Sequence, residues 1–205
     1  MKRYPLSVLL CFSFMTTFTS NAKEWRVSSP DNRLSVTVNC GKVTTYEVEY
    51  GNKQIIEPSP ISMTCSNGKV IGHNANVKKV TRKSANDILH PVIRQKAQIS
   101  RMNIIVWSLH AGDWSLEFRV YDDGFGYRFN TQFKDSINVL DEEATFRLAG
   151  DYETLFPEVK SLLTAQQPTF TPLKLSEIKT DQYCCTPLLM KGDDNIRVFL
   201  VDDKN

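Results

Sequence analysis

Trp114-Ser-Leu-Glu-Phe-Arg-Val-Tyr121, Asp122-Asp123-Gly124 and Phe125-Gly-Tyr-Arg-Phe-Asn130 form one continuous stretch of this 205-residue chain. Apolar and polar residues alternate on both sides of the Asp-Gly pair, which predicts two β-strands joined by a tight hairpin turn. A two-residue turn at Asp123-Gly124 places Phe118 opposite Phe129 and Arg119 opposite Arg128. The stretch therefore predicts an antiparallel hairpin with two chemically different faces.

One face of this hairpin is almost entirely apolar and is the predicted core. Successive side chains of a strand point to opposite faces, so alternate positions share a face. The predicted core face consists of Trp114, Leu116, Phe118, Val120, Phe125, Tyr127, Phe129 and Phe133. Such aromatic neighbours on adjacent strands stabilise a sheet by roughly 0.2 to 1 kcal/mol a pair.

The opposite face carries Glu117, Arg119, Tyr121, Arg128 and Asn130. The predicted register sets Arg119 against Arg128, and two opposed cations repel. Glu117 can neutralise one of them from a neighbouring position. Two interpretations follow for Arg119 and Arg128: a solvated sheet face, or a docking surface for an acidic partner domain.

Alternation of the same kind recurs along the chain and predicts an all-β fold of mostly antiparallel strands. Further strands are expected at 25–27, 34–38, 44–50, 54–57, 77–82, 92–99, 102–109, 145–148, 186–190 and 196–201. Residues 100–101 are expected to be a tight link between two of them. Residues 151–178 contain few clean alternations, so we expect a loop-rich segment there, with at most one short helix at 158–165.

The first 22 residues have the pattern of a secretory signal peptide. Lys2 and Arg3 precede an apolar run at 6–14, and Ser20-Asn-Ala22 offers a cleavage site. A secreted or periplasmic protein spanning residues 23–205 is therefore expected. No later run approaches the ~20 apolar residues that a membrane-spanning helix needs.

Charge argues against a nucleic-acid partner. The formal net charge is +2, and cleavage after Ala22 would remove two basic residues and no acidic one. The remaining chain would be balanced, whereas general nucleic-acid binding depends on excess Lys and Arg.

Four cysteines remain after the leader: Cys40, Cys65, Cys184 and Cys185. An exported protein can oxidise them, and four cysteines allow three pairings. The neighbours Cys184 and Cys185 form the least favourable pair because the ring would be strained. The second interpretation is that all four are buried, unpaired thiols.

No catalytic residue can be assigned from motifs. The chain contains no nucleophile elbow, no His-Glu-x-x-His and no phosphate-binding loop. Acidic pairs at 122–123 and 193–194 fall in expected turns, where Asp is favoured by its own backbone hydrogen bonds. The acidic run 141–143 precedes an expected strand and is assigned to a solvated edge, whereas Asp202 and Asp203 stay open as carboxylates for chemistry or calcium.

Several segments together resemble the N-terminal domain of glycoside hydrolase family 97, over about residues 24–205. The most specific is Phe118-Arg-Val-Tyr-Asp-Asp-Gly-Phe-Gly-Tyr-Arg-Phe129. The others are Val27-Ser-Ser-Pro-Asp-Asn-Arg-Leu-Ser-Val36, the 46–50 strand, Pro58-Ser-Pro60, Lys174-Leu-Ser-Glu-Ile178 and Cys185-Thr-Pro-Leu-Leu-Met190.

This resemblance implies a β-super-sandwich that precedes a (β/α)₈ barrel in secreted α-glucosidases and α-galactosidases, mostly of Bacteroidetes. The catalytic carboxylates of the family lie in the barrel, and no segment of this sequence resembles it. We therefore expect a non-catalytic domain that supports the barrel and its active-site rim and contacts an α-glucoside or α-galactoside, but is inactive alone. The resemblance also implies that Asp202 reaches a calcium ion held chiefly by the barrel, at a position where relatives more often have Glu.

Two alternatives come from other functional classes. A stand-alone carbohydrate-binding module would need an exposed aromatic platform, for which the candidates are Trp25, Trp107, Tyr152, Phe156 and Phe170. The other alternative is the remnant of a truncated gene without a selected activity.

Overall fold

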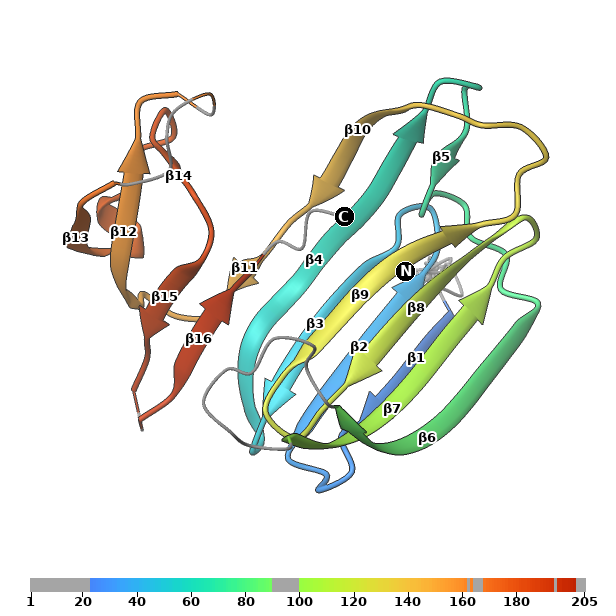
Figure 1. The fold of residues 1–205 in the computed structure, drawn as a ribbon, viewed down its shortest axis with the longest axis horizontal. Helices are drawn as coiled ribbons and strands as arrows, with labels where there is room; N and C mark the ends of the chain where they lie inside the picture. The colour runs from blue at the N-terminus through green and yellow to red at the C-terminus, as the bar shows by residue number, and fades with distance from the viewer. Residues whose placement is uncertain (1–22, 90–99, 162, 164–167, 194, 202–205) are drawn as a thin grey trace, which may run out of the picture.

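The computed structural model describes residues 23–89, 100–161, 163, 168–193 and 195–201. Their strands form three antiparallel sheets, drawn in Figure 1. The expected leader at 1–22 and the expected strand at 92–99 lie outside the described residues.

The first sheet begins with β1, β2 and β3 in chain order, continues through the long strand β4, and ends at β10. Its strands are β1 (Lys23–Ser28), β2 (Leu34–Cys40), β3 (Thr45–Tyr50), β4 (Lys53–Cys65) and β10 (Val139–Ala144), with β5 (Val70–Ile71) and β11 (Arg147–Leu148) paired to β4. The second sheet is a simple meander of β6 (Lys79–Leu89), β7 (Ser100–His110), β8 (Trp114–Val120) and β9 (Phe125–Thr131).

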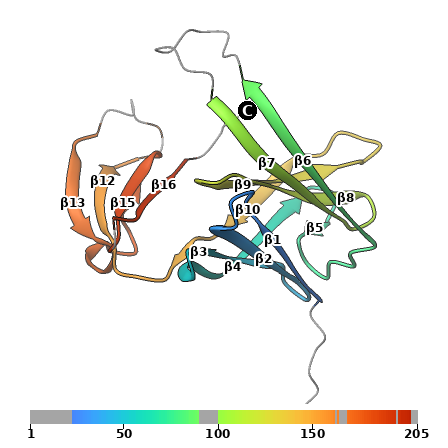
Figure 2. The same cartoon turned by 90° about the horizontal axis from the view of Figure 1, so that it is seen from below.

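These two sheets pack face to face as a sandwich (Figure 2). Tyr46 of β3 is fully buried between them. Its ring centroid lies 5.8 Å from that of Phe125 and 5.7 Å from that of Tyr127, both in the second sheet. Leu116, Phe118 and Val120 are buried in the same core. The all-β sandwich and the apolar face of the 114–129 hairpin are therefore confirmed.

A third, smaller sheet stands beside the sandwich (Figure 1). Its order is β13 (Phe170–Lys174), β12 (Glu153–Val159), β15 (Leu188–Lys191), β16 (Arg197–Leu200), and β14 (Tyr183–Cys184) pairs with β12. It has a core of its own, made of Tyr152, Phe156, Leu188 and Met190. Leu148 and Val198 pack against both cores and so join the small sheet to the sandwich.

The short helix expected at 158–165 is wrong at its start, because Glu158 and Val159 are the last residues of β12. In the described residues the helical structure is the 3₁₀ turn η1 (Leu175–Glu177). The expected loop at 151–178 is wrong for the same reason: β12 and β13 occupy much of it and pair with each other. Pro172 is accommodated because β13 is an edge strand, where a missing N–H need not break a ladder.

Three further boundaries differ from expectation. Residues 100–101 are part of β7 and pair with Ile88 and Leu89, so they are not a link. The acidic residues 141–143 lie within β10 rather than before a strand, paired with β4. Of the strand expected at 145–148, β11 contains residues 147–148.

Among the described residues, no helix has the length and apolar character needed to cross a membrane.

Candidate functional site

The charged face of the β8–β9 hairpin is arranged differently from the predicted register. Phe118 lies opposite Tyr127, Arg119 opposite Gly126, and Arg128 opposite Glu117. The predicted opposition of Arg119 and Arg128 is therefore wrong by two residues. The loop is longer than expected. The pairing begins at Val120 and Phe125, so residues 121–124 form the loop, and within it the Tyr121 N–H donates to the Gly124 carbonyl at 2.8 Å.

Glu117 forms salt bridges with both arginines of this face. Its Oε1 lies 3.1 Å from Arg119 Nε and 2.9 Å from Arg128 Nη2. The carboxylate is mostly buried while both arginines are substantially exposed. One carboxylate shared by two cations leaves an excess positive charge, but each cation has a partner within the sheet.

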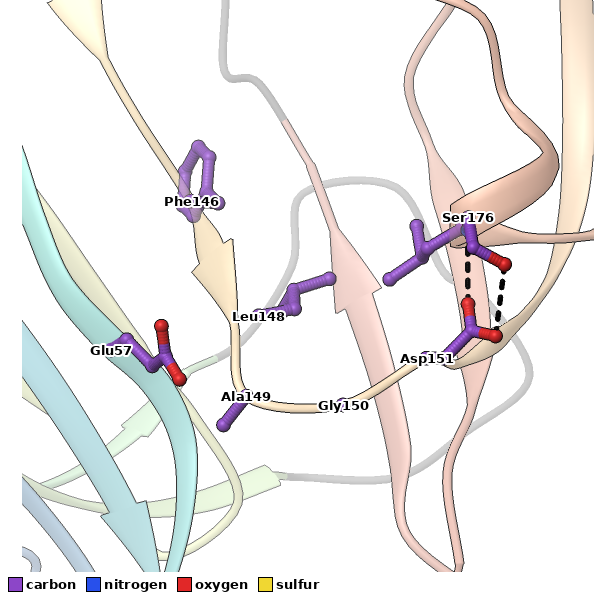
Figure 3. Close-up of a pocket in the computed structure, with 8 residues that line it drawn as sticks. Glu57, Phe146, Leu148, Ala149, Gly150, Asp151 and Ser176 are labelled. Carbon is purple, nitrogen blue, oxygen red and sulfur yellow. Dashed lines mark hydrogen bonds between the residues drawn. The ribbon is translucent and has the colours of Figure 1, made fainter.

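A shallow hollow of about 530 Å³ lies where the sandwich meets the small sheet (Figure 3). Glu57 of β4 lies on its sandwich side, and Asp151 and Ser176 lie on the side of the small sheet. Phe146 and Leu148 contribute apolar surface between them. The hollow thus combines two carboxylates, an aromatic ring and a hydroxyl group.

Asp151 is held rigidly in this hollow. Its carboxylate accepts hydrogen bonds from the Ser176 backbone N–H at 2.9 Å and the Ser176 hydroxyl at 3.0 Å. These bonds favour the ionised form and lower the pKa of Asp151 below its ordinary value, with Lys174 adding to the effect. A carboxylate kept ionised can accept hydrogen bonds from a ligand's hydroxyl groups but is unsuited to act as a general acid, which needs a raised pKa.

Linear motifs did not identify this hollow. Glu57, Asp151 and Ser176 come from distant segments, none with a recognisable spacing. The one local signal is Gly150, at which a Cβ would lie 3.2 Å from the Tyr152 ring, so the chain turns tightly into the small sheet there.

The aromatic candidates do not assemble into one exposed platform. Trp107, Tyr152 and Phe156 are buried in the two cores. Trp25 is partly buried against the sandwich core, whereas Phe170 on β13 is exposed.

Two of the acidic residues singled out in the sequence have partners within the fold. Asp122 accepts a hydrogen bond from the Asp31 N–H at 2.9 Å, and Glu143 accepts one from the Ser62 hydroxyl. Asp202, expected to reach calcium, lies outside the described residues. Within the described part of the chain, no group of three His, Cys, Asp or Glu side chains is placed to hold a metal ion.

The four cysteines after residue 22 are unpaired thiols. Cys40 and Cys65 are buried, and Cys184 and Cys185 are half-buried. Burial raises the pKa of the Cys40 and Cys184 thiols, which disfavours the reactive thiolate. This arrangement agrees with the interpretation of the cysteines as unpaired thiols, but only Cys40 and Cys65 are buried core residues.

The chain is similar in sequence or in fold to several known enzymes. Over 207 residues the chain is 30% identical to a retaining alpha-galactosidase of Bacteroides thetaiotaomicron, covering 96% of this chain and 31% of that protein. The fold also matches a crystal structure of a beta-arabinopyranosidase, with a TM-score of 0.70, 19% identity, and coverage of 85% of this chain and 31% of the other.

A glycoside hydrolase family 97 enzyme from Pseudoalteromonas sp. strain K8, solved with acarbose, matches with a TM-score of 0.69 and 15% identity. That match covers 84% of this chain and 27% of the enzyme. The chain thus spans about a third or less of the length of these relatives. The family model described as Glycosyl-hydrolase 97 N-terminal matches residues 27–202, and the chain therefore belongs to this family.

Proposed function

We propose that this chain is the non-catalytic N-terminal domain of a family 97 type glycoside hydrolase, and that it supports the catalytic barrel and the rim of its active site. The observation that carries the proposal is the alignment of 96% of the chain with only 31% of an α-galactosidase. A segment that aligns along nearly its whole length with one part of an enzyme is most simply one domain of such an enzyme. The proposal includes export to the periplasm or cell exterior through residues 1–22.

The state of three described carboxylates supports a structural role for these groups. The pKa values of Asp31, Asp113 and Asp151 are all lowered, by hydrogen bonds from Ser29, Lys69 and Ser176 respectively as the main causes. A glycosidase acid instead needs a carboxyl group with a raised pKa. These groups are used to hold turns and element ends together.

Carbohydrate contact is a secondary part of the proposal, and the junction hollow is its best location. The exposed carboxylate of Glu57, the fixed carboxylate of Asp151 and the half-exposed ring of Phe146 suit hydroxyl groups and an apolar sugar face. The stand-alone binding module is less well supported, because three of its five aromatic candidates are buried.

A chimera tests the supporting role. Residues 23–205 would replace the matching segment of the Bacteroides thetaiotaomicron α-galactosidase, and the control would be that enzyme with the segment deleted. We expect the chimera to be soluble and to hydrolyse nitrophenyl α-galactoside, and the deleted form to lose solubility or turnover. Equal turnover and thermal stability of the two proteins would refute a supporting role.

The chain by itself is expected to show no turnover of nitrophenyl α-glucoside or α-galactoside, with or without calcium. Hydrolysis that requires calcium and disappears in Asp202→Ala would contradict this expectation and make the chain an enzyme in its own right.

A further inference from the structure

The small sheet has one face that packs on a core and one that does not. Phe156, Met190 and Val198 point to the core face. Side chains alternate along a strand, so residues one position away point to the other face. We call this second surface the outer face.

An apolar row crosses the outer face. Pro172, Leu155, Leu189 and Phe199 are successive cross-strand partners on β13, β12, β15 and β16, so their side chains lie side by side. Leu155 is 42% exposed and Phe199 59% exposed. Phe170, two residues before Pro172 on the same face of β13, is also exposed. Contiguous exposed apolar groups of this kind mark interaction surfaces.

A charged row runs directly beside the apolar one. Lys174, Glu153, Lys191 and Arg197 are cross-strand partners in the same way. Glu153 lies 3.5 Å from Lys191, but no described carboxylate forms a salt bridge with Lys174 or Arg197. Between the rows lies a hollow of about 460 Å³, lined by Leu155, Leu189 and all four members of the charged row. The outer face therefore offers an apolar depression whose rim carries more cations than carboxylates: Glu153 and Glu177 lie there with Lys174, Lys191 and Arg197, and Lys174 and Arg197 have no salt bridge among the described residues.

A second copy of the chain fits this surface poorly. In a face-to-face pair with two-fold symmetry, the charged row of one copy would lie against either the charged row or the apolar row of the other copy. Lys174 and Arg197 would then lose water without gaining a carboxylate, which is costly. The better occupant supplies an apolar projection for the hollow and carboxylates opposite the two cations.

We propose that the outer face is the surface on which the catalytic part of the longer enzyme docks, through an apolar contact flanked by carboxylates of that part. This inference rests on the proposed function and deepens it by naming the docking surface. It is motivated by the charge pattern and by relatives that are about three times as long as the matched segment. Contacts between domains of one chain commonly bury about 600 to 1,500 Å². The apolar row and the charged row, which each cross four strands, would form part of such a contact.

Hydroxyl-radical footprinting tests the proposal on the isolated chain and on the chimera described above. We expect the oxidation rates of Phe199 and Leu155 to fall at least fivefold in the chimera. Leu140 of β10 is the matched control, since it is 67% exposed and belongs to another sheet. Its rate should stay the same in both proteins.

Charge reversal supplies the second test. Arg197→Glu in the chimera should restore the oxidation rate of Phe199, because it places a carboxylate against those of the partner. Arg119→Glu, on the β8–β9 hairpin, should leave that rate low. Protection lost in Arg119→Glu and kept in Arg197→Glu would overturn the assignment and place docking on the hairpin face.

The remaining outcomes are also decisive. An active chimera in which Phe199 is oxidised as fast as in the isolated chain overturns this inference and leaves the proposed function standing. An inactive, aggregated chimera contradicts the proposed function and this inference with it. Protection of Phe199 that grows with the concentration of the isolated chain, without a further change in the chimera, identifies a second copy as the occupant and overturns the proposal. Protection of Phe199 that appears only when an α-linked oligosaccharide is added also overturns the proposal.

Discussion

Replacing Phe118 by alanine should remove a large part of the stability of the sandwich. The Phe118 side chain is fully buried, and its ring centroid lies 5.9 Å from those of Trp107 and Tyr127 and 6.3 Å from that of Tyr46. Truncating a buried Phe to Ala costs roughly 3 to 5 kcal/mol, because transfer energy is lost and a cavity is left. Typical domains have only about 5 to 15 kcal/mol of stability. A chain of this size should therefore lose about 6 to 20 °C in melting temperature, at roughly 2 to 4 °C per kcal/mol.

Urea unfolding followed by tryptophan fluorescence measures this loss, since Trp107 packs directly on Phe118. Phe199→Ala is the matched control: its ring is 59% exposed, so the free energy of unfolding should change by less than about 0.5 kcal/mol. The dependence of that free energy on urea should be similar in all three proteins. A loss below about 1 kcal/mol for Phe118→Ala, or equal losses for the two variants, would refute the placement of the core between the two larger sheets.

Three smaller changes test other contacts. Gly192→Ala should destabilise the small sheet by about 1 to 3 kcal/mol, because the new Cβ would overlap the Tyr152 ring. Gly124→Ala is the control, since its Cβ meets nothing within 4 Å, and equal melting temperatures of the two variants would contradict this packing. Glu117→Gln should cost at most about 1 kcal/mol at low salt and nothing measurable near 1 M salt, because the arginines it pairs with are exposed. The pKa of Asp151 is lower in the folded chain than in the unfolded one, so its contribution is complete above the ordinary carboxyl pKa of about 3.9 and is lost as the pH falls below it. Asp151→Asn should lose stability at neutral pH and flatten the acid branch of a pH titration of melting temperature, and an unchanged acid branch would argue against the contact.

The face of each strand could be predicted from sequence more reliably than its register. The hairpin at 114–130 was expected to pair with Phe118 opposite Phe129, but it pairs with Phe118 opposite Tyr127. The side-chain period of a strand is two, so a slip of two residues keeps every side chain on its face. The core face was therefore correct while the opposition of Arg119 and Arg128 was wrong. The longer loop is favoured by a contact that is distant in sequence, from the Asp31 N–H to the carboxylate of Asp122.

The region after residue 150 was the least predictable from sequence. Its strands contain Pro157 and Pro172, which are signals of loops, and its first strand was partly expected to be helical. Pairing on both sides of β12 outweighs these local preferences, because β13 and β15 satisfy its backbone and Phe156 is buried in the core of the small sheet. The junction hollow and the outer face were missed for the same reason, since each is made by residues that meet only after the sheets have formed.

The all-β class, the apolar face of the central hairpin and the family can be predicted without coordinates, because alternation and a specific motif are local properties of the chain. The tertiary structure alone decided that Glu117 lies against both arginines, that Asp151 is fixed by Ser176, and that Leu155 and Phe199 line up across the small sheet. Each of these arrangements depends on the register between strands and on contacts between distant segments, and alternation specifies which face a side chain takes but not which residue lies beside it.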